Sequence, residues 1–289
     1  MPLFFFLSGL LYHDSDKFVK KRITQLIIPF FAFSIISIPI KYIERCILQR
    51  AFYINIFYLS PQFYNIPLWF CISLFTISCI FWGLKKYCKD IRIMLTFSIL
   101  ISFCGLALSY CKIFLPLYLS QSLLAFPYYA IGFYSNSVIK INWKGTIIAI
   151  LILIYAQFSH ISTNISGLIV NANPLLFYIP ALSGIYIIIH ASMLRGGNRY
   201  RAFLLIFIFL GRNSLYIFAL HWPFITILQK FNEVIGIDKH IGNIFIFFTI
   251  IILSLCIGTL LAYLFPKYFR PISLKEKSTN SGIKHPKRV

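Results

Sequence analysis

Residues 243–265 read NIFIFFTIIILSLCIGTLLAYLF, an apolar run without a single charged side chain. A helix needs about 20 predominantly apolar residues to cross the ~30 Å core of a bilayer, so this run predicts a transmembrane helix. The whole chain shares its character, because 59% of the 289 residues are hydrophobic and only 12% are charged. Soluble domains carry about 25% charged residues. The composition therefore excludes a disordered or fibrous chain and an ordinary water-soluble enzyme.

Seven further runs of this kind precede residues 243–265, and a shorter apolar run begins the chain. The short run, residues 1–12, would cover only about 18 Å as a helix and is too short to span a membrane alone. The others lie near residues 23–43, 67–84, 93–111, 117–139, 145–159, 174–193 and 213–229. These runs predict an all-α fold, a polytopic transmembrane helical bundle of about nine spans. We expect a membrane domain over residues 1–265 and a basic cytoplasmic tail over residues 266–289.

The positive charge follows an alternating pattern along the connections between these runs. Of the 27 Lys and Arg residues, 21 lie on one predicted side, in residues 13–22, 85–92, 140–144, 194–212 and 266–289. Such residues accumulate in the cytoplasmic loops of membrane proteins. The pattern therefore predicts an external N-terminus and a cytoplasmic C-terminus whose tail lies near anionic membrane lipid. It accounts for the net charge of +20, so we expect no nucleic-acid partner.

The acidic residues and the cysteines exclude other kinds of site. All acids are expected in loops or in the tail: Asp14, Asp16, Glu44, Asp90, Glu233, Asp238 and Glu276. Ion-coupled transporters commonly use carboxylates inside the membrane, so their absence argues against a coupled carrier and leaves an uncoupled one open. The seven cysteines include no CxxC and no pairing with histidine. They indicate neither a metal site nor a disulfide framework.

His221 is the ionisable residue of greatest interest within a predicted span. It belongs to residues 211–223, GRNSLYIFALHWP. A titratable side chain in hydrocarbon is costly, so His221 is expected to face a polar cavity. Pro223 has no N–H, and the carbonyl of Ala219 therefore loses its helical partner. Two interpretations stay open: a functional histidine, or a histidine bonded to a neighbouring helix beside a tolerated proline kink.

Polar residues just before this helix have structural and functional interpretations. Asn213 and Ser214 are candidate caps of the helix. Arg212, placed near the positive end of the helix dipole, suits an anion or simply the positive-inside pattern. His190, near the cytoplasmic end of its run, is the other histidine in a predicted span.

A basic cluster and an aromatic motif complete the set of candidates. Lys21 and Arg22 belong to FVKKRITQLIIPF, residues 18–30. They act either as a stop-transfer signal or as a patch that holds the phosphates of a nucleotide-bearing donor. Trp69, in PLWF, is either an anchor at the membrane interface or an aromatic platform for a sugar ring.

Five stretches, in order, resemble the acyltransferase-3 family, the integral-membrane O-acyltransferases of surface polysaccharides that include proteins like fucose 4-O-acetylase. They are MPLFFFLSG (1–9), FVKKRITQLIIPF (18–30), PLWFCISLF (67–75), LAFPYYAIGF (124–133) and LGRNSLYIFALHWP (210–223). The resemblance covers nearly all the chain to about residue 269. It implies an acyl group, commonly acetyl from acetyl-CoA, that is taken at the cytoplasmic side and delivered to a hydroxyl of a lipid-linked or extracytoplasmic glycan.

The chain departs from the family pattern at two places. The family carries a spaced Arg and His pair in a first span, and a histidine commonly stands directly before the stretch that begins at Met1. That span and its pair are absent here, and two explanations stay open: a start codon assigned too late, or a truncated gene with an inactive product. The second departure is Gln25, where many relatives carry another arginine.

The resemblance implies roles for the residues that remain. His221 is the best remaining candidate for the base or orienting group of acyl transfer, and Arg22 with Lys21 for the donor phosphates. We expect no bound cofactor, with acetyl-CoA or another acyl-CoA as donor substrate, membrane lipid and a glycan acceptor as partners, and a multi-pass location in the inner (plasma) membrane. A polysaccharide transporter or flippase and an O-antigen-polymerase-like protein remain alternatives. Candidates for lining the cavity are Ser8, Trp69, Asn213 and Ser214.

Overall fold

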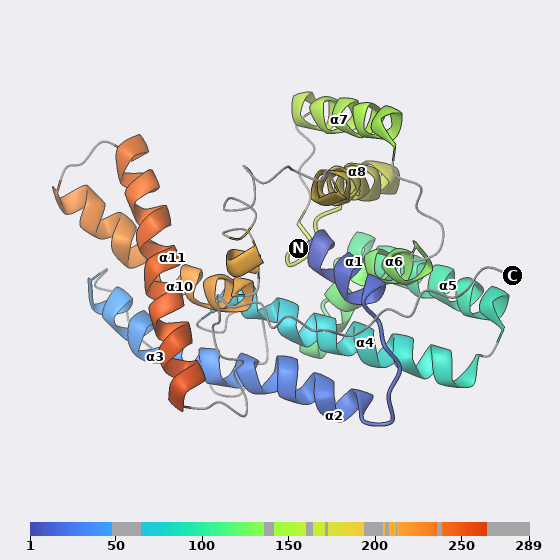
Figure 1. The fold of residues 1–289 in the computed structure, drawn as a ribbon, viewed down its shortest axis with the longest axis horizontal. Coiled ribbons are helices and arrows are strands. Elements are labelled where there is room, and N and C mark those ends of the chain that lie inside the picture. The colour runs from blue at the N-terminus through green and yellow to red at the C-terminus, as the bar shows by residue number, and fades with distance from the viewer. Residues whose placement is uncertain are drawn as a thin grey trace, which may run out of the picture.

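The computed structural model shows a helical bundle (Figure 1). It describes residues 1–47, 65–88, 90–135, 142–159, 164–170, 173–193, 205, 208–211, 213–235 and 239–264. In this part of the chain every long element is a helix, and the β-bridge is an isolated pair between Asn164 and Ile169. The predicted all-α fold is confirmed. The predicted tail, residues 266–289, and Arg212 lie outside the described residues.

Each predicted apolar run coincides with a described helix. The bounds are α1 (Pro2–Leu10), α2 (Phe18–Arg22), α3 (Ile28–Ile47), α4 (Trp69–Tyr87), α5 (Ile91–Tyr110), α6 (Leu119–Ser135), α7 (Trp143–Phe158), α8 (Pro174–Met193), α10 (Ser214–Ile235) and α11 (Lys239–Leu264). A π-helical segment, Ile23–Ile27, joins α2 to α3. Short 3₁₀ turns, Ile66–Leu68 and Pro116–Tyr118, lead into α4 and α6.

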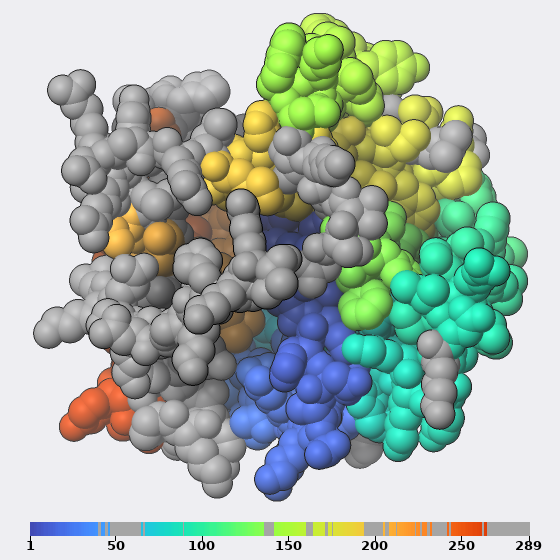
Figure 2. Space-filling view, turned by 45° about the vertical axis from the view of Figure 1, so that its right-hand side comes forward, coloured from blue at the N-terminus to red at the C-terminus, as the bar shows by residue number. Residues whose placement is uncertain are grey.

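Among the described residues, five helical segments are long and apolar enough to cross a membrane. They are Phe18–Pro39, Trp69–Tyr87, Ile91–Tyr110, Leu176–Met193 and Ile244–Leu261. The helices also turn large apolar side chains outward, as Phe103 of α5, Tyr155 of α7 and Phe248 of α11 show. Figure 2 shows α7 projecting from the top of the molecule. Outward apolar surface on helices whose backbone groups are bonded internally suits lipid, and the chain is a multi-pass membrane protein.

Two helices continue further than their apolar runs. Helix α3 ends at Ile47 and α10 at Ile235, several residues beyond the predicted ends at 43 and 229. Glu44 and Glu233 therefore lie near the ends of helices, and their predicted placement in loops was wrong. The reason is local propensity, because Lys, Glu, Arg and Gln are good helix formers and extend a helix past the apolar stretch.

Helix α1 lies inside the bundle and crosses α6 at very short range. Phe5 and Phe6 are fully buried. A Cβ atom on Gly9 would overlap the carbonyl oxygen of Tyr129, and one on Gly132 would overlap the carbonyl oxygen of Phe6. Small residues permit such backbone contact between helices in membranes. The short run that cannot span alone is thus a core helix, and its two ends lie near the two sites described next.

Candidate functional site

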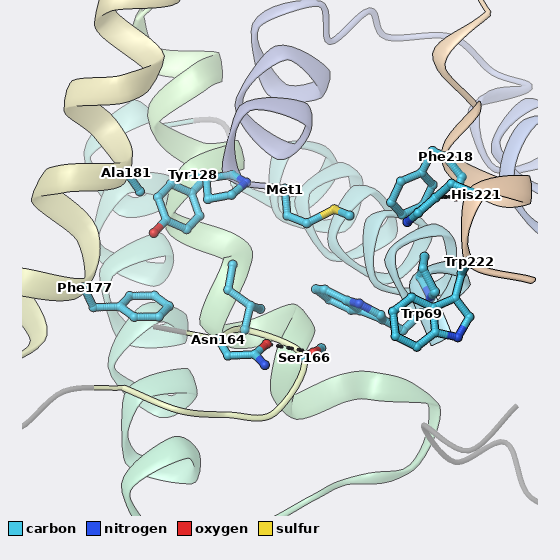
Figure 3. Close-up of a pocket in the computed structure, with 13 residues that line it drawn as sticks. Met1, Trp69, Tyr128, Asn164, Ser166, Phe177, Ala181, Phe218, His221 and Trp222 are labelled. Carbon is cyan, nitrogen blue, oxygen red and sulfur yellow. Dashed lines mark hydrogen bonds between the residues drawn. The ribbon is translucent and has the colours of Figure 1, made fainter. Parts of the chain in front are cut away.

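A cavity of about 360 Å³ lies among α1, α4, α6, α8 and α10 (Figure 3). Small-molecule sites span roughly 300–1,000 Å³ and combine apolar walls with a few polar groups. The cavity has this composition, because aromatic rings form much of its wall and four polar residues join them. The aromatic residues are Trp69, Phe177, Phe218 and Trp222, and the polar ones are Tyr128, Asn164, Ser166 and His221. The structure therefore brings together two predicted site residues, His221 and Trp69, that are far apart in the sequence.

A contact with its own helix selects the tautomer of the neutral His221 imidazole. Its Nδ1 lies 2.7 Å from the carbonyl oxygen of Phe218. A carbonyl oxygen only accepts hydrogen bonds, so Nδ1 carries the hydrogen in this contact. In the neutral imidazole, Nε2 then carries the lone pair. A half-buried imidazole in the wall of a cavity can thus accept a proton from a bound hydroxyl.

The helix that carries His221 is hydrogen-bonded to the rest of the bundle through the carbonyl that Pro223 leaves without a helical partner. The carbonyl of Ala219, which cannot bond to the proline nitrogen of Pro223, accepts a hydrogen bond from Asn65 Nδ2. The same amide donates to Ser37 Oγ of α3 at 3.0 Å. Asn65 is only 1% exposed, and it links α3, the start of α4 and α10. Sequence reasoning missed Asn65, because its partners lie far away in the sequence.

Replacement of Asn65 by Leu is expected to destabilise the protein by about 1–3 kcal/mol, because the buried carbonyl of Ala219 loses its donor. Pro223→Ala would supply a backbone N–H to that carbonyl. The cost of Asn65→Leu should therefore be smaller in the Pro223→Ala background than in the parent. A double-mutant cycle of thermal unfolding in detergent measures this coupling. Equal costs in both backgrounds would contradict the proposed pairing.

Trp69 and Trp222 form one end of the cavity. Figure 3 shows the two indole rings near His221, whereas Phe177 and Tyr128 lie at the other end. Trp69 is 5% exposed and packs against other aromatic rings: its ring centroid lies 6.3 Å from that of Phe5 and 6.4 Å from that of Tyr118. Such packing restricts the rotamer of Trp69. The ring is therefore a rigid wall of the cavity, and not only an anchor at the membrane surface.

Arg22 marks a second polar site, near the other end of α1. Its guanidinium lies 5.1 Å from the centre of the Phe18 ring, a distance typical of a cation–π contact. It also interacts electrostatically with the hydroxyls of Tyr12 and Tyr129. Both hydroxyls are buried, and neither makes a hydrogen bond of good geometry with the described residues. Lys21, by contrast, is exposed, so Arg22 is the cation that α2 turns into the bundle.

The remaining candidates lie elsewhere in the described structure. Ser8 is half-buried on α1, and Ser214 is half-buried at the first position of α10. Asn213 is buried and donates through Nδ2 to the carbonyl of Phe209 at 2.9 Å. None of the three is among the described residues that line the cavity.

His190 lies outside the cavity as well. Its Nδ1 is hydrogen-bonded to Thr146 Oγ1, across the contact between α7 and α8. This histidine is therefore bonded to a neighbouring helix, and it offers a matched comparison for His221.

In a comparison with protein families, a family model described as an acyltransferase domain matches residues 1–263. The matched segment includes both the cavity and the site around Arg22. Comparison with curated proteins and with solved structures gives no match.

Proposed function

The chain belongs to the acyltransferase-3 family and is a membrane acyltransferase, and from this premise we propose that it transfers an acetyl group from acetyl-CoA to a hydroxyl of a cell-surface or lipid-linked glycan in the inner (plasma) membrane. The observation that carries the proposal is His221, whose neutral imidazole has its lone pair on Nε2, in a cavity walled by indole rings. The family favours this activity over a polysaccharide transporter and over a polymerase.

The proposed chemistry is acyl transfer with general-base assistance. Nε2 of His221 takes the proton of the sugar hydroxyl while the hydroxyl oxygen attacks the thioester carbonyl carbon. The carbon–sulfur bond then breaks, and the imidazolium returns the proton to the departing CoA thiolate. The products are the acetyl ester and free CoA. A positioned base contributes roughly 10²–10⁴-fold to such a step.

The donor is proposed to bind through Arg22. Helix α1 separates the two sites, because Met1 lines the cavity while Tyr12, just beyond its other end, interacts with Arg22. The nine residues of α1 span about 14 Å along the helix axis. The extended linear arm of an acyl-CoA can bridge such a separation. The charge pattern predicts that the Arg22 side is cytoplasmic. This arrangement supports a donor whose phosphates meet Arg22 while its thioester reaches toward His221.

The overall activity is tested in cells that produce the protein and in control cells with the empty vector. Surface glycan is isolated from both, and ester-linked acetate is released by mild base and quantified. We expect additional ester-linked acetate only in the producing cells. Equal acetate in the two cell populations would contradict the proposed function.

Arg22→Ala is expected to raise the acetyl-CoA concentration needed for half-maximal rate by about 10- to 100-fold, because a charge-assisted contact contributes roughly 1.5–3 kcal/mol. Lys20→Ala is the matched control, since Lys20 is an exposed cation on the same short helix. It should leave the donor dependence unchanged. The measurement is the initial rate of transfer from labelled acetyl-CoA in membrane vesicles. Unchanged donor dependence in Arg22→Ala would leave that residue with only its topological role.

A further inference from the structure

A short hairpin lines the cavity on the side away from Met1 (Figure 3). The backbone groups of Asn164 and Ile169 bond to each other in both directions, at 3.0 and 2.9 Å. Between them, Leu168 adopts a left-handed conformation with φ of 51°. Its side chain is nevertheless 3% exposed, so the hairpin is anchored by an apolar residue that is packed into the bundle.

Two buried polar side chains tether this hairpin to neighbouring helices. Ser109 of α5 donates to the carbonyl of Leu168 at 2.9 Å, and Gln121 of α6 donates to the carbonyl of Ser166 at 3.2 Å. Ser109 and Gln121 are 3% and 1% exposed. Buried donors satisfied by a loop hold that loop in a defined place. The hairpin is therefore a preorganised part of the cavity wall, as a recognition element requires.

The hairpin presents an amide and a hydroxyl to the cavity. Ser166 Oγ donates to Asn164 Oδ1 at 2.8 Å, and the N–H of Gly167 approaches the same oxygen at 3.3 Å. These contacts orient the amide, whose Nδ2 has no hydrogen bond to the described residues. They also leave the oxygen of Ser166 able to accept. A hydroxyl-rich ligand needs such donors and acceptors in combination.

Polar groups on one side and flat aromatic rings on another suit one class of ligand. A sugar ring has an apolar face that can lie on an indole, and an edge of hydroxyls that needs hydrogen bonds. We propose that Asn164 and Ser166 select the acceptor by binding hydroxyls of a sugar ring that lies on Trp222 beside Trp69, with its reacting hydroxyl toward His221. This inference rests on the proposed acyl transfer and adds the residues that distinguish one acceptor sugar from another.

The test measures binding separately from transfer. Protein purified in detergent, with Trp82→Phe and Trp143→Phe introduced, retains only the two tryptophans of the cavity. Its fluorescence is titrated with methyl hexosides and with their singly deoxygenated analogues. We expect a saturable change, and a loss of at least about tenfold in affinity for one deoxy analogue, because a site built to bond a hydroxyl rejects the ligand that lacks it. Asn164→Ala and Ser166→Ala should each lower the affinity for the unmodified methyl hexoside about tenfold. They should also abolish the difference in affinity between this hexoside and its deoxy analogue.

Controls separate recognition from folding and from catalysis. Ser102→Ala, which removes a hydroxyl bonded within α5, should leave the titration unchanged, and gel filtration should show the same monodisperse species for every variant. No glycoside-dependent signal in the parent, or unchanged discrimination in the hairpin variants, would overturn the inference. Glycoside selection without acetyl transfer would refute the proposed reaction and leave the hairpin as a sugar-binding element. Transfer with unchanged acceptor selection in the hairpin variants would refute the hairpin's role alone.

Discussion

Cells that produce His221→Ala are expected to acetylate their surface glycan at least about 100-fold more slowly than cells with the parent protein, because removal of a positioned general base costs roughly 10²–10⁴-fold. The imidazole lies in the cavity wall, and its contact with the Phe218 carbonyl places the hydrogen of the neutral ring on Nδ1 and the lone pair on Nε2. No other histidine lies among the described residues that line the cavity. The measurement is the rate of appearance of ester-linked acetate, normalised to the amount of protein in the membrane.

His190→Ala is the matched control for this experiment. His190 is also a histidine within a helix of the bundle, but its partner is Thr146 between α7 and α8. Its replacement should leave the transfer rate within about twofold, with at most a modest loss of stability of roughly 1 kcal/mol from the lost hydrogen bond. Undiminished transfer in His221→Ala would remove His221 from the mechanism. An equal loss in both variants would indicate a general effect on folding.

Gly132→Ala is expected to destabilise the protein by about 3 kcal/mol or more, at the upper end of what overpacking costs. A single methyl group at this position would overlap the carbonyl oxygen of Phe6. The obstacle is backbone, so no side-chain rotation relieves it, and α1 has to move away from α6. Because α1 carries Met1 to the cavity and Tyr12 to the Arg22 site, both sites should be disturbed together.

Gly184→Ala is the matched control, because it also adds one methyl group to a glycine within a helix. Nothing lies within 4 Å of a Cβ atom added to Gly184, and alanine is favoured over glycine in a helix by up to about 1 kcal/mol. This variant should therefore be as stable as the parent or slightly more stable. Thermal loss of the monodisperse peak in detergent, followed by size-exclusion chromatography, measures both variants. Equal melting of the two alanine variants would show that the close crossing of α1 and α6 contributes little.

Much of the local structure was predictable because it depends on residues close in sequence. Each apolar run is a helix, since in lipid every backbone group must find a partner within its own segment. The loss of a helical partner at the Ala219 carbonyl was predictable for the same reason, because proline four residues later has no N–H. The helical positions of Glu44 and Glu233 were not predictable from hydropathy. Hydropathy shows where an apolar run ends, but residues with high helix propensity continue the helix beyond it.

The candidate site was predictable only in part. An ionisable residue in hydrocarbon has to face something polar, and His221 does line a cavity. The sequence of the basic cluster did not show which of its side chains faces the bundle, so the half-buried position of Arg22 and the exposed position of Lys21 could not be predicted. Ser8, Asn213 and Ser214 were inferred from resembling stretches, and a stretch does not reveal which of its faces meets a cavity. The hairpin at residues 164–170 carries no motif, and sequence reasoning passed over it.

The amino-acid sequence by itself determined that this protein is a membrane-embedded helical bundle. The free energy of transferring a long uncharged run from water into the bilayer depends on the composition and length of that run. The family resemblance, which the domain match bears out, added the reaction class. Only the tertiary structure decided which residues share a cavity: Trp69, Asn164 and His221 come from separate segments that meet through packing. Asn65 satisfies a carbonyl 154 residues away, and no local preference specifies such a pairing. The shape of the site is therefore determined by how α1 packs among its neighbours, and it does not follow from the individual helices.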